Sequence, residues 1–288
     1  MVSLSLFCRM ILSKKSAPFW DHAPAEMQPR SILITGASSG IGRALALIYA
    51  RQGVSLSLIG RDRERLEDAA AAARAQGAEV SLGQLDVRDQ DAMTQWIEAA
   101  DARRPFDLVI ANAGITTGLA PGDLAEDPRA VRTIIGINLI GVLNTVEPLI
   151  ASMCGRGTGQ IALIGSIAGV RGLPYAPSYC ATKAAVHAYS ESLRGRIEAR
   201  GVRVSLVIPG FVKTPLNDRI DAIKPLEITG AEAAVLIQRG LERGKAIIAF
   251  PKSLYLLACL SRVLPVRLVD KVMARFKVNI PQTQERIR

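Results

Sequence analysis

Short apolar, β-branched runs alternate with longer amphipathic runs along most of this chain, and this alternation restricts the fold more than any other feature. Seven runs have the length and composition of strands: Ser31–Thr35, Val54–Ile59, Glu79–Leu85, Asp107–Ala111, Gln160–Gly165, Val202–Ile208 and Ala246–Phe250. The runs between them are typical of helices: Gly40–Gln52, Asp62–Gln76, Asp89–Arg103, Asp127–Met153, Pro177–Arg200 and Ala231–Arg243. Parallel neighbouring strands need long crossovers, and those crossovers are helices. We therefore predict an α/β fold with a doubly wound parallel sheet of about seven strands and helices on both faces.

The alternation covers residues 30–250, which we interpret as one domain. Residues 1–29 form an N-terminal extension that we expect to be poorly ordered. Its apolar start is interrupted by Arg9 and followed by Lys14, the reverse of the order in a signal peptide. Met27, just before the first strand, is an alternative start of translation. Residues 251–288 break the alternation, and we expect an apolar and basic helical extension there.

The net charge of +10 is compatible with three kinds of partner: nucleic acid, an anionic membrane or a phosphorylated ligand. The cations are not interleaved with aromatic residues and no nucleic-acid motif occurs, so we expect no nucleic-acid partner. The cysteines Cys8, Cys154, Cys180 and Cys259 have neither metal-site nor redox spacing. We predict reduced thiols in a cytoplasmic protein and no metal site.

A glycine-rich loop connects the first strand to the first helix. It contains Gly36, Ser38, Ser39, Gly40, Ile41 and Gly42. Gly36 permits a tight turn, Gly40 allows a pyrophosphate to approach the backbone, and Gly42 allows close packing of helix on strand. The free N–H groups of the helix start would then face the phosphates. We predict a Rossmann-type dinucleotide site, with a purely structural turn as the alternative.

Five motifs in register resemble those of the short-chain dehydrogenase/reductase family. Beyond the glycine loop they are Asn112-Ala113-Gly114, Asn138, Ser166 with Tyr179 and Lys183, and the stretch Pro209 to Thr214. The resemblance covers about Arg30 to Phe250. It implies that this span is an NAD(P)-binding catalytic domain and that Asn112, Ala113 and Gly114 contact the cofactor. It also implies that Pro209, Gly210, Val212 and Thr214 lie over the nicotinamide.

Gly60 and Arg61 end the second strand, where a carboxylate would favour NAD over NADP. A guanidinium can instead hold a phosphate through two hydrogen bonds, and Ser39 could add a hydroxyl. We therefore predict a preference for NADP(H), with a solvated Arg61 beside Asp62 as the alternative. Asp86 and Val87 resemble the family's adenine-contacting pair, although Asp86 could equally cap a helix or a turn.

Tyr179 and Lys183 are four residues apart on a predicted helix, so they share one face. A phenol with a pKa of about 10 is a poor base, and a nearby ammonium should lower that pKa. Tyr179 would then exchange a proton with the substrate oxygen, which Ser166 would hold by a hydrogen bond. By resemblance, Asn138 holds a water beside Lys183, and Lys183 also binds the nicotinamide ribose. We interpret His187 as a packing residue at a helix interface.

Two segments are predicted to line the substrate pocket, Val170 to Ala176 and Leu216 to Ile228. The C-terminal extension has an apolar run, Leu254–Leu260, and then a basic amphipathic run, Val266–Val278, in which Val269, Val272, Met273 and Phe276 share a face. Six cations oppose one carboxylate between Lys252 and Lys277. Two interpretations stay open: an anchor on an anionic membrane, or a helical pair packed on the domain or on a second subunit.

The combined prediction is an NADP-dependent ketoreductase or alcohol dehydrogenase that acts on an apolar or lipid-like carbonyl or alcohol. The alternative is a cofactor-binding regulator or redox sensor without turnover. Family members commonly pair through two long helices, which here are Asp127–Met153 and Pro177–Arg200. We therefore expect a homodimer or homotetramer in the cytoplasm, with the inner membrane surface as the place of any membrane contact.

Overall fold

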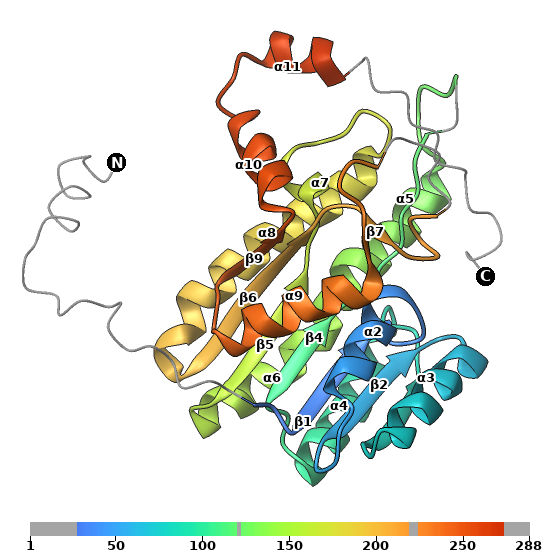
Figure 1. Cartoon of the computed structure of the whole chain (residues 1–288), viewed down its shortest axis with the longest axis vertical. Coiled ribbons are helices and arrows are strands. Elements are labelled where there is room, and N and C mark those ends of the chain that lie inside the picture. The colour runs from blue at the N-terminus through green and yellow to red at the C-terminus, as the bar shows by residue number, and fades with distance from the viewer. Residues whose placement is uncertain (1–27, 120–121, 219–223, 274–288) are drawn as a thin grey trace, which may run out of the picture.

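The fold is organised around β1 (Ser31–Thr35), all five residues of which are buried. Burial on both faces is the pattern of a central strand in a parallel sheet, so β1 needs helices above and below it. The structure is a computed structural model that describes residues 28–119, 122–218 and 224–273 (Figure 1). Asp107 fixes the start of β1, because its Oδ2 accepts from the backbone N–H groups of Arg30 and Ser31 at 2.8 and 2.9 Å.

A seven-stranded parallel sheet has the order β3-β2-β1-β4-β5-β6-β9. Its other strands are β2 (Ser55–Gly60), β3 (Glu79–Gln84), β4 (Leu108–Ala111), β5 (Gly159–Ile164), β6 (Val202–Pro209) and β9 (Ile247–Phe250). The order reverses between β1 and β4, and ligands of such sheets bind outside the carboxyl ends of the strands at that point. The predicted α/β, doubly wound parallel sheet is confirmed.

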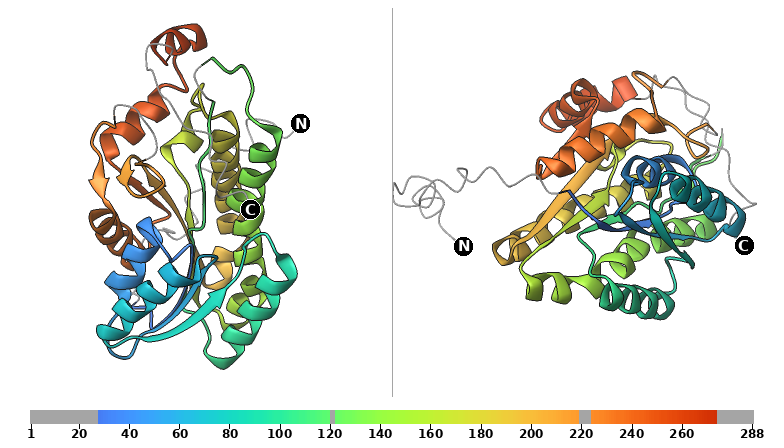
Figure 2. Two further views of the ribbon diagram at one scale, coloured as in Figure 1. Left: turned by 90° about the vertical axis from the view of Figure 1, so that its right-hand side faces the viewer. Right: turned by 60° about the horizontal axis from the view of Figure 1, so that its bottom comes forward.

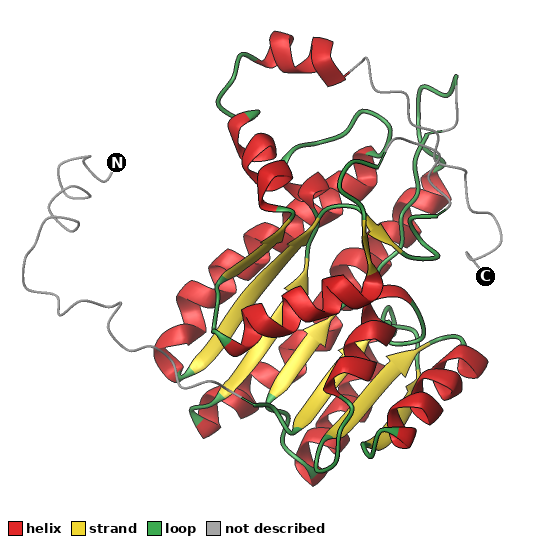
Figure 3. Cartoon of the chain, viewed as in Figure 1, coloured by secondary structure: helices red, strands yellow, loops and turns green. Residues whose placement is uncertain are grey.

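Helices cover both faces of the sheet (Figures 1 and 2). One hydrophobic cluster joins the sheet to α2 (Gly40–Tyr49), α3 (Arg63–Ala75) and α9 (Gly230–Glu242). The other joins it to α4 (Gln90–Arg103), α6 (Gly141–Arg156) and α8 (Pro177–Ile197). The alternation of red helices and yellow strands in Figure 3 follows the periodicity of the sequence.

The predicted long helical region over Asp127–Met153 is confirmed, but its middle is a π-helical segment. The structure has α5 (Pro128–Ile135), a π-helical segment η1 (Gly136–Ile140) and α6. Gly136 and Gly141 bound the π segment, and a Cβ on Gly141 would lie 2.5 Å from the Val87 side chain. Such π insertions often occur at functional sites. Pro128–Arg156 is long and apolar enough to cross a membrane, but half of its most apolar stretch is buried in the fold.

Several short elements were not predicted. The helix α7 (Ile167–Val170) follows β5, and a 3₁₀ turn η2 (Glu198–Arg200) extends α8. The strands β7 (Val212–Lys213) and β8 (Ile228–Thr229) form a separate two-stranded parallel sheet. They bring the chain after β6 back to the start of α9.

The C-terminal extension forms α10 (Lys252–Leu260) and α11 (Val266–Met273). Its inner side packs on the domain: Tyr255, Ala258 and Cys259 contact the core beneath α8. Two arginine contacts reinforce this, Arg262 Nη1 to the Val170 carbonyl at 3.1 Å and Arg171 Nη2 to Asp270 at 2.8 Å.

Some sequence predictions fall outside the described residues. These include residues 1–27 with Cys8 and Met27, part of the substrate segment at 219–223, and residues 274–278 of the basic run. Cys154, Cys180 and Cys259 are free thiols. Within residues 28–119, 122–218 and 224–273, no group of three or more His, Cys, Asp or Glu side chains could hold a metal ion.

Candidate active site

The glycine loop turns sharply between β1 and α2. Gly36 and Gly40 have φ of +67° and +55°, a left-handed region that favours glycine. A Cβ on Gly42 would lie 2.3 Å from the Gly36 carbonyl oxygen, so this glycine allows the first turn of α2 to close on the loop. The N-cap residue Ser39 makes no side-chain cap on α2. The first amides of the helix can therefore donate to an anion, as pyrophosphate binding requires.

Asn112 ties the loop after β4 to the glycine loop. Its Nδ2 donates to the carbonyl oxygens of Thr35 and Gly36 at 3.0 and 3.3 Å. The Thr35 hydroxyl in turn accepts from the backbone N–H groups of Asn112 and Ala113 at 3.1 and 3.3 Å. This locks the two loops together across the reversal of strand order. Thr35 is a site residue that sequence reasoning missed, because its partner is 77 residues away.

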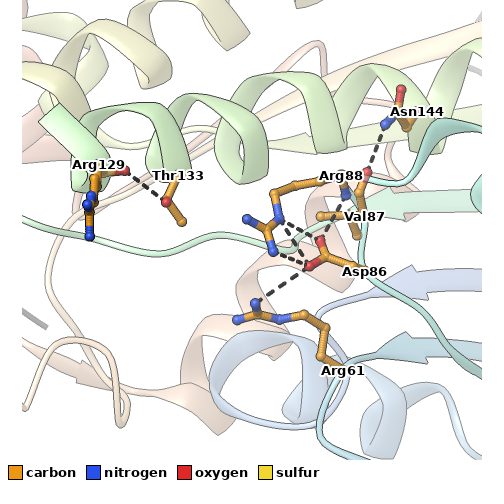
Figure 4. Close-up of polar contacts among 7 residues, drawn as sticks. All are labelled: Arg61, Asp86, Val87, Arg88, Arg129, Thr133 and Asn144. Carbon is orange, nitrogen blue, oxygen red and sulfur yellow. Dashed lines mark hydrogen bonds and ion pairs between the residues drawn. The ribbon is translucent and has the colours of Figure 1, made fainter. Parts of the chain in front are cut away.

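Two arginines surround Asp86 beyond the carboxyl end of β3 (Figure 4). Arg88 makes the closer contact, with Nη2 2.6 Å from Oδ2 and Nε 3.0 Å from both carboxylate oxygens. Arg61 lies farther away, with Nη1 3.7 Å from Oδ2. Burial acts to raise the pKa of Asp86, but the Arg88 hydrogen bonds and the charges of Arg88 and Arg61 outweigh it and lower that pKa. Asp86 is therefore an ionised partner of Arg88.

This pairing leaves Arg61 as the looser of the two cations, and its side chain is 36% exposed. Arg65, bound to Asp62 at 2.9 Å, lines the same part of the cavity. Val87 is held from behind, because its carbonyl accepts from Asn144 Nδ2 at 2.9 Å (Figure 4). Arg65 and Arg88 were not predicted as site residues. The available sequence signal for Arg88 was its position two residues after Asp86, a predicted adenine contact.

Tyr179 lies in the first turn of α8, and its side chain faces Ser166, which lies two residues beyond the end of β5. Burial raises the pKa of Tyr179, and the neighbouring Ser166 side chain only partly offsets this. The expectation that Lys183 lowers the pKa of this phenol is therefore wrong for the protein alone, because desolvation of the phenolate is the larger effect. Ser166 also begins α7, accepting from the Ala168 N–H at 3.1 Å.

Lys183 and Asn138 lie behind the tyrosine. Lys183 Nζ is 5.9 Å from the centre of the Tyr179 ring and donates to the Ile164 carbonyl at 2.9 Å. Burial lowers the pKa of this lysine to about 8. Asn138 lies within the π segment, where its Oδ1 accepts from the Ile115 N–H at 2.8 Å and its Nδ2 donates to the Ile115 carbonyl at 2.9 Å. Asn138 thus fixes the backbone beside Lys183.

The start of α8 is held by a residue that sequence reasoning missed. Ala176 provides no side-chain cap, and Glu126 takes that place. Its carboxylate accepts from both the backbone N–H and the hydroxyl of Ser178 at 2.8 Å. Glu126 reaches α8 from the loop after β4, so the turn that carries Tyr179 is connected to a distant segment. No sequence signal indicates this contact, because 52 residues separate the partners.

The segment after β6, which is predicted to lie over a nicotinamide, packs against the glycine loop. Thr214 is buried, and a Cβ on Gly40 would lie 3.2 Å from its Cγ2. Gly210 packs against Pro251 and Leu254, so the C-terminal extension lies directly behind this segment. Val212 is fixed by pairing with Ile228.

One cavity of about 510 Å³ joins these parts. It is lined by nearly all the predicted residues: Gly36, Ser38, Ser39, Gly40, Ile41, Arg61, Asp86, Val87, Asn112, Ala113, Gly114, Ser166, Tyr179, Lys183, Pro209, Gly210, Val212 and Thr214. Gly42 and Asn138 do not line it, because Gly42 packs inside the turn and Asn138 lies behind Lys183. The volume is that of a small-molecule or cofactor site.

The two predicted substrate segments are separated in the structure. Leu216 and Asn217 line the large cavity. Val170 to Pro174 instead line a second cavity of about 540 Å³ between α7, α8 and the C-terminal extension. Tyr175 connects the loops, because its carbonyl accepts from the Leu119 N–H at 2.8 Å.

Comparison with known proteins agrees with this geometry. The family model described as short chain dehydrogenase matches residues 30–224. A Myxococcus xanthus protein described as an uncharacterized oxidoreductase is 37% identical over 254 residues, which span 88% of this chain and all of that protein. A short-chain dehydrogenase from Sphingobium yanoikuyae, solved with NADPH, is 27% identical with a TM-score of 0.72 over 88% of this chain and 97% of its own.

A Burkholderia phymatum short-chain dehydrogenase/reductase solved with NAD is 24% identical, with a TM-score of 0.74 over 82% of this chain and 94% of its own, and shows the fold alone. The seven-stranded sheet, the glycine loop and the matched family model point to one conclusion. The chain is a member of the short-chain dehydrogenase family, a family of nicotinamide-dependent oxidoreductases.

Proposed function

We propose that the protein is an NADP(H)-dependent carbonyl reductase or alcohol dehydrogenase. The observation that carries the proposal is that Tyr179, Lys183 and Ser166 line the same cavity as the glycine loop and Arg61. The residues fit a dinucleotide: uncapped amides of α2 for the pyrophosphate, arginines at one end and a proton donor at the other. When bound, the nicotinamide would supply or accept the hydride.

The proton is the protein's part of the reaction. The phenol of Tyr179 and the hydroxyl of Ser166 are neighbours that line one cavity, so one substrate oxygen can reach both. Ser166 would hold that oxygen, and Tyr179 would donate its proton as charge develops on it. The phenol of Tyr179 is protonated at neutral pH, as an unperturbed tyrosine is, and burial raises its pKa further. The protonated phenol is the form needed to reduce a carbonyl. Lys183 would then return a proton to the Tyr179 phenolate. The path would be the water that Asn138 is predicted to hold beside Lys183.

The preference for NADP(H) is supported by the charges at the far end of the cavity. Gly60 is where a carboxylate would select NAD, and Arg61 and Arg65 line the cavity beside it. Arg88 holds Asp86 at 2.6 Å, whereas Arg61 contacts that carboxylate only at 3.7 Å, so Arg61 would be able to turn to a 2′-phosphate. The relative from Sphingobium yanoikuyae was solved with NADPH.

The test is a panel of carbonyl compounds, including long-chain ketones, assayed by oxidation of NADPH and of NADH. Turnover of at least one ketone with NADPH supports the proposal. Cofactor binding without turnover of any member, in either direction, would favour the non-catalytic regulator instead.

An apolar substrate and a membrane location are supported by the outer face of the extension. We define this face by Leu256, Leu257, Leu260, Val263, Val266 and Leu268, each more than half exposed. Exposed Lys252, Arg267 and Lys271 flank it. The extension therefore packs through its inner side and presents apolar and basic groups outward, the combination that binds anionic lipid surfaces. We infer that the enzyme works in the cytoplasm, on the inner membrane surface.

A homodimer is supported by the outer face of α5 and α8. Ile135 and Ile140 are each 40% exposed, and α8 exposes Ala181, Ala184 and Ala188, the first two of which also line the second cavity. Small side chains allow two long helices to approach closely, and exposed isoleucines gain free energy from burial. We infer that two copies pair through this face.

A further inference from the structure

Two successive turns of α8 hold the end of β5. Lys183 Nζ donates to the carbonyl of Ile164. One turn later, His187 Nε2 accepts from the backbone N–H of Ser166 at 3.4 Å. The two side chains thus bind backbone groups on either side of Gly165. The helix that carries the proposed proton donor, Tyr179, therefore also holds the backbone of Ile164 and Ser166.

Gly165 and Gly169 make room for the imidazole. A Cβ on Gly165 would lie 2.5 Å from His187 Nε2 and 2.8 Å from Cδ2. A Cβ on Gly169 would lie 2.9 Å from Nε2, with the Lys183 backbone equally close. Neither glycine has a positive φ, so a left-handed turn does not explain them. Their lack of a side chain instead allows His187 to approach Ser166.

The hydrogen bond also determines the protonation state of the ring. Nε2 can accept from an N–H only when it is unprotonated, so the single proton of the neutral ring is on Nδ1. Burial and the neighbouring charge of Lys183 lower the pKa of His187 to about 4. The ring is therefore neutral at neutral pH and does not exchange protons with the substrate.

Ser166 has little freedom once this bond is made. Its backbone is extended at φ −169°, and its hydroxyl caps α7 through the Ala168 N–H. A small rotation of its peptide would move the hydroxyl away from Tyr179. We propose that His187 is a positioning residue for carbonyl reduction: it fixes the backbone N–H of Ser166 and thereby aims the Ser166 hydroxyl at the oxygen that Tyr179 protonates. The inference rests on the proposed function of this site.

The test compares His187→Gln, which keeps an acceptor at the length of Nε2, with His187→Leu, which fills the space without one. His187→Leu should lower kcat about 10- to 100-fold, because a misplaced catalytic group has effects of that size. His187→Gln should recover most of that loss. In both variants the Kd for NADPH should change by less than about twofold, because the substitution is not coupled to cofactor binding.

Two further measurements separate positioning from simple packing. In a Ser166→Ala background, His187→Leu should cost almost nothing in kcat, because its effect passes through the missing hydroxyl. An equal loss in both backgrounds would overturn the proposal. Hydrogen exchange at the Ser166 amide does not depend on turnover: it should accelerate in His187→Leu and stay slow in His187→Gln. An unchanged rate in His187→Leu would refute the inference even if the proposed function holds, and a parent without ketone turnover would refute the proposed function alone.

Discussion

The ammonium of Lys183 is bound to the carbonyl oxygen of Ile164, the last residue of β5, at 2.9 Å. Lys183 is therefore fixed before any cofactor is present, at a cost in desolvation that lowers its pKa to about 8. Ser166, two residues beyond Ile164, is positioned by the same helix. The geometry of the proposed proton-transfer groups thus depends on contacts of α8 with the end of β5 and the residues that follow it.

Tyr179→Phe should remove turnover and leave cofactor binding nearly intact. The phenol is the proposed proton donor, and general acid–base catalysis is worth about 10²- to 10⁴-fold. The measurement is kcat with the best ketone of the panel, together with the Kd for NADPH. Activity above about a tenth of the parent's would exclude Tyr179 as the donor.

Arg61→Ala should weaken the binding of NADPH much more than the binding of NADH. The difference between the two binding free energies should narrow by about 1 to 3 kcal/mol, the value of a hydrogen bond to a charged group. Binding titrations of both cofactors measure this gap. The matched control is Arg63→Ala, which removes an exposed arginine that does not line the cavity. Equal dissociation constants in the parent would contradict the proposed preference.

The unfolding free energy of the cofactor-free protein should rise between pH 8 and pH 10 because of Lys183. Its pKa is about 8 in the fold and 10.5 when unperturbed, so the unfolded chain binds more protons in this window. Above pH 10 the raised pKa of Tyr179 also enters. Relative to Lys183→Met, the parent should gain roughly 1 to 3 kcal/mol in urea titrations across the window. The same pH dependence in both proteins would show that Lys183 stays charged throughout.

Ala184→Arg should convert the proposed dimer to a monomer. The new side chain would place a charge between two closely packed helices, where it is both too large and unpaired. Light scattering at micromolar concentration measures the mass, with Ala151→Arg, at an exposed position of α6, as the control substitution. A parent that is already monomeric would argue against pairing through α5 and α8.

Replacing Leu256, Leu257 and Leu260 together by serine should abolish flotation with anionic vesicles. Each buried leucine would otherwise contribute about 1.5 to 3 kcal/mol. Leu124→Ser, a fully exposed leucine outside the extension, should float as the parent does. Added salt should weaken flotation, because exposed charges are screened within about 8 Å at physiological ionic strength. If the parent does not float at low salt, the outer face has another partner.

Much of the fold and of the site could be predicted from local patterns. The period of apolar residues located all seven strands of the sheet to within one or two residues, because parallel strands are buried on both faces and their helices on one. The four-residue spacing of Tyr179 and Lys183 is enough to place both on one face of α8. Likewise, the positions of Gly36 and Gly40 indicated a turn that needs positive φ.

What only the tertiary structure decided depends on distant partners and on burial. Arg88 holds Asp86 more closely than Arg61 does, and Glu126 holds the start of α8, because loops from different strands meet at one sheet edge. The direction of the Tyr179 pKa shift depends on how deeply the fold buries the phenol. The packing of the C-terminal extension likewise depends on Arg262 meeting the Val170 carbonyl across 92 residues. Periodicity and spacing depend only on the helix or strand to which a residue belongs, so they can be read from the sequence. Burial and long-range contacts arise only when the folded sheet brings distant segments of the chain together.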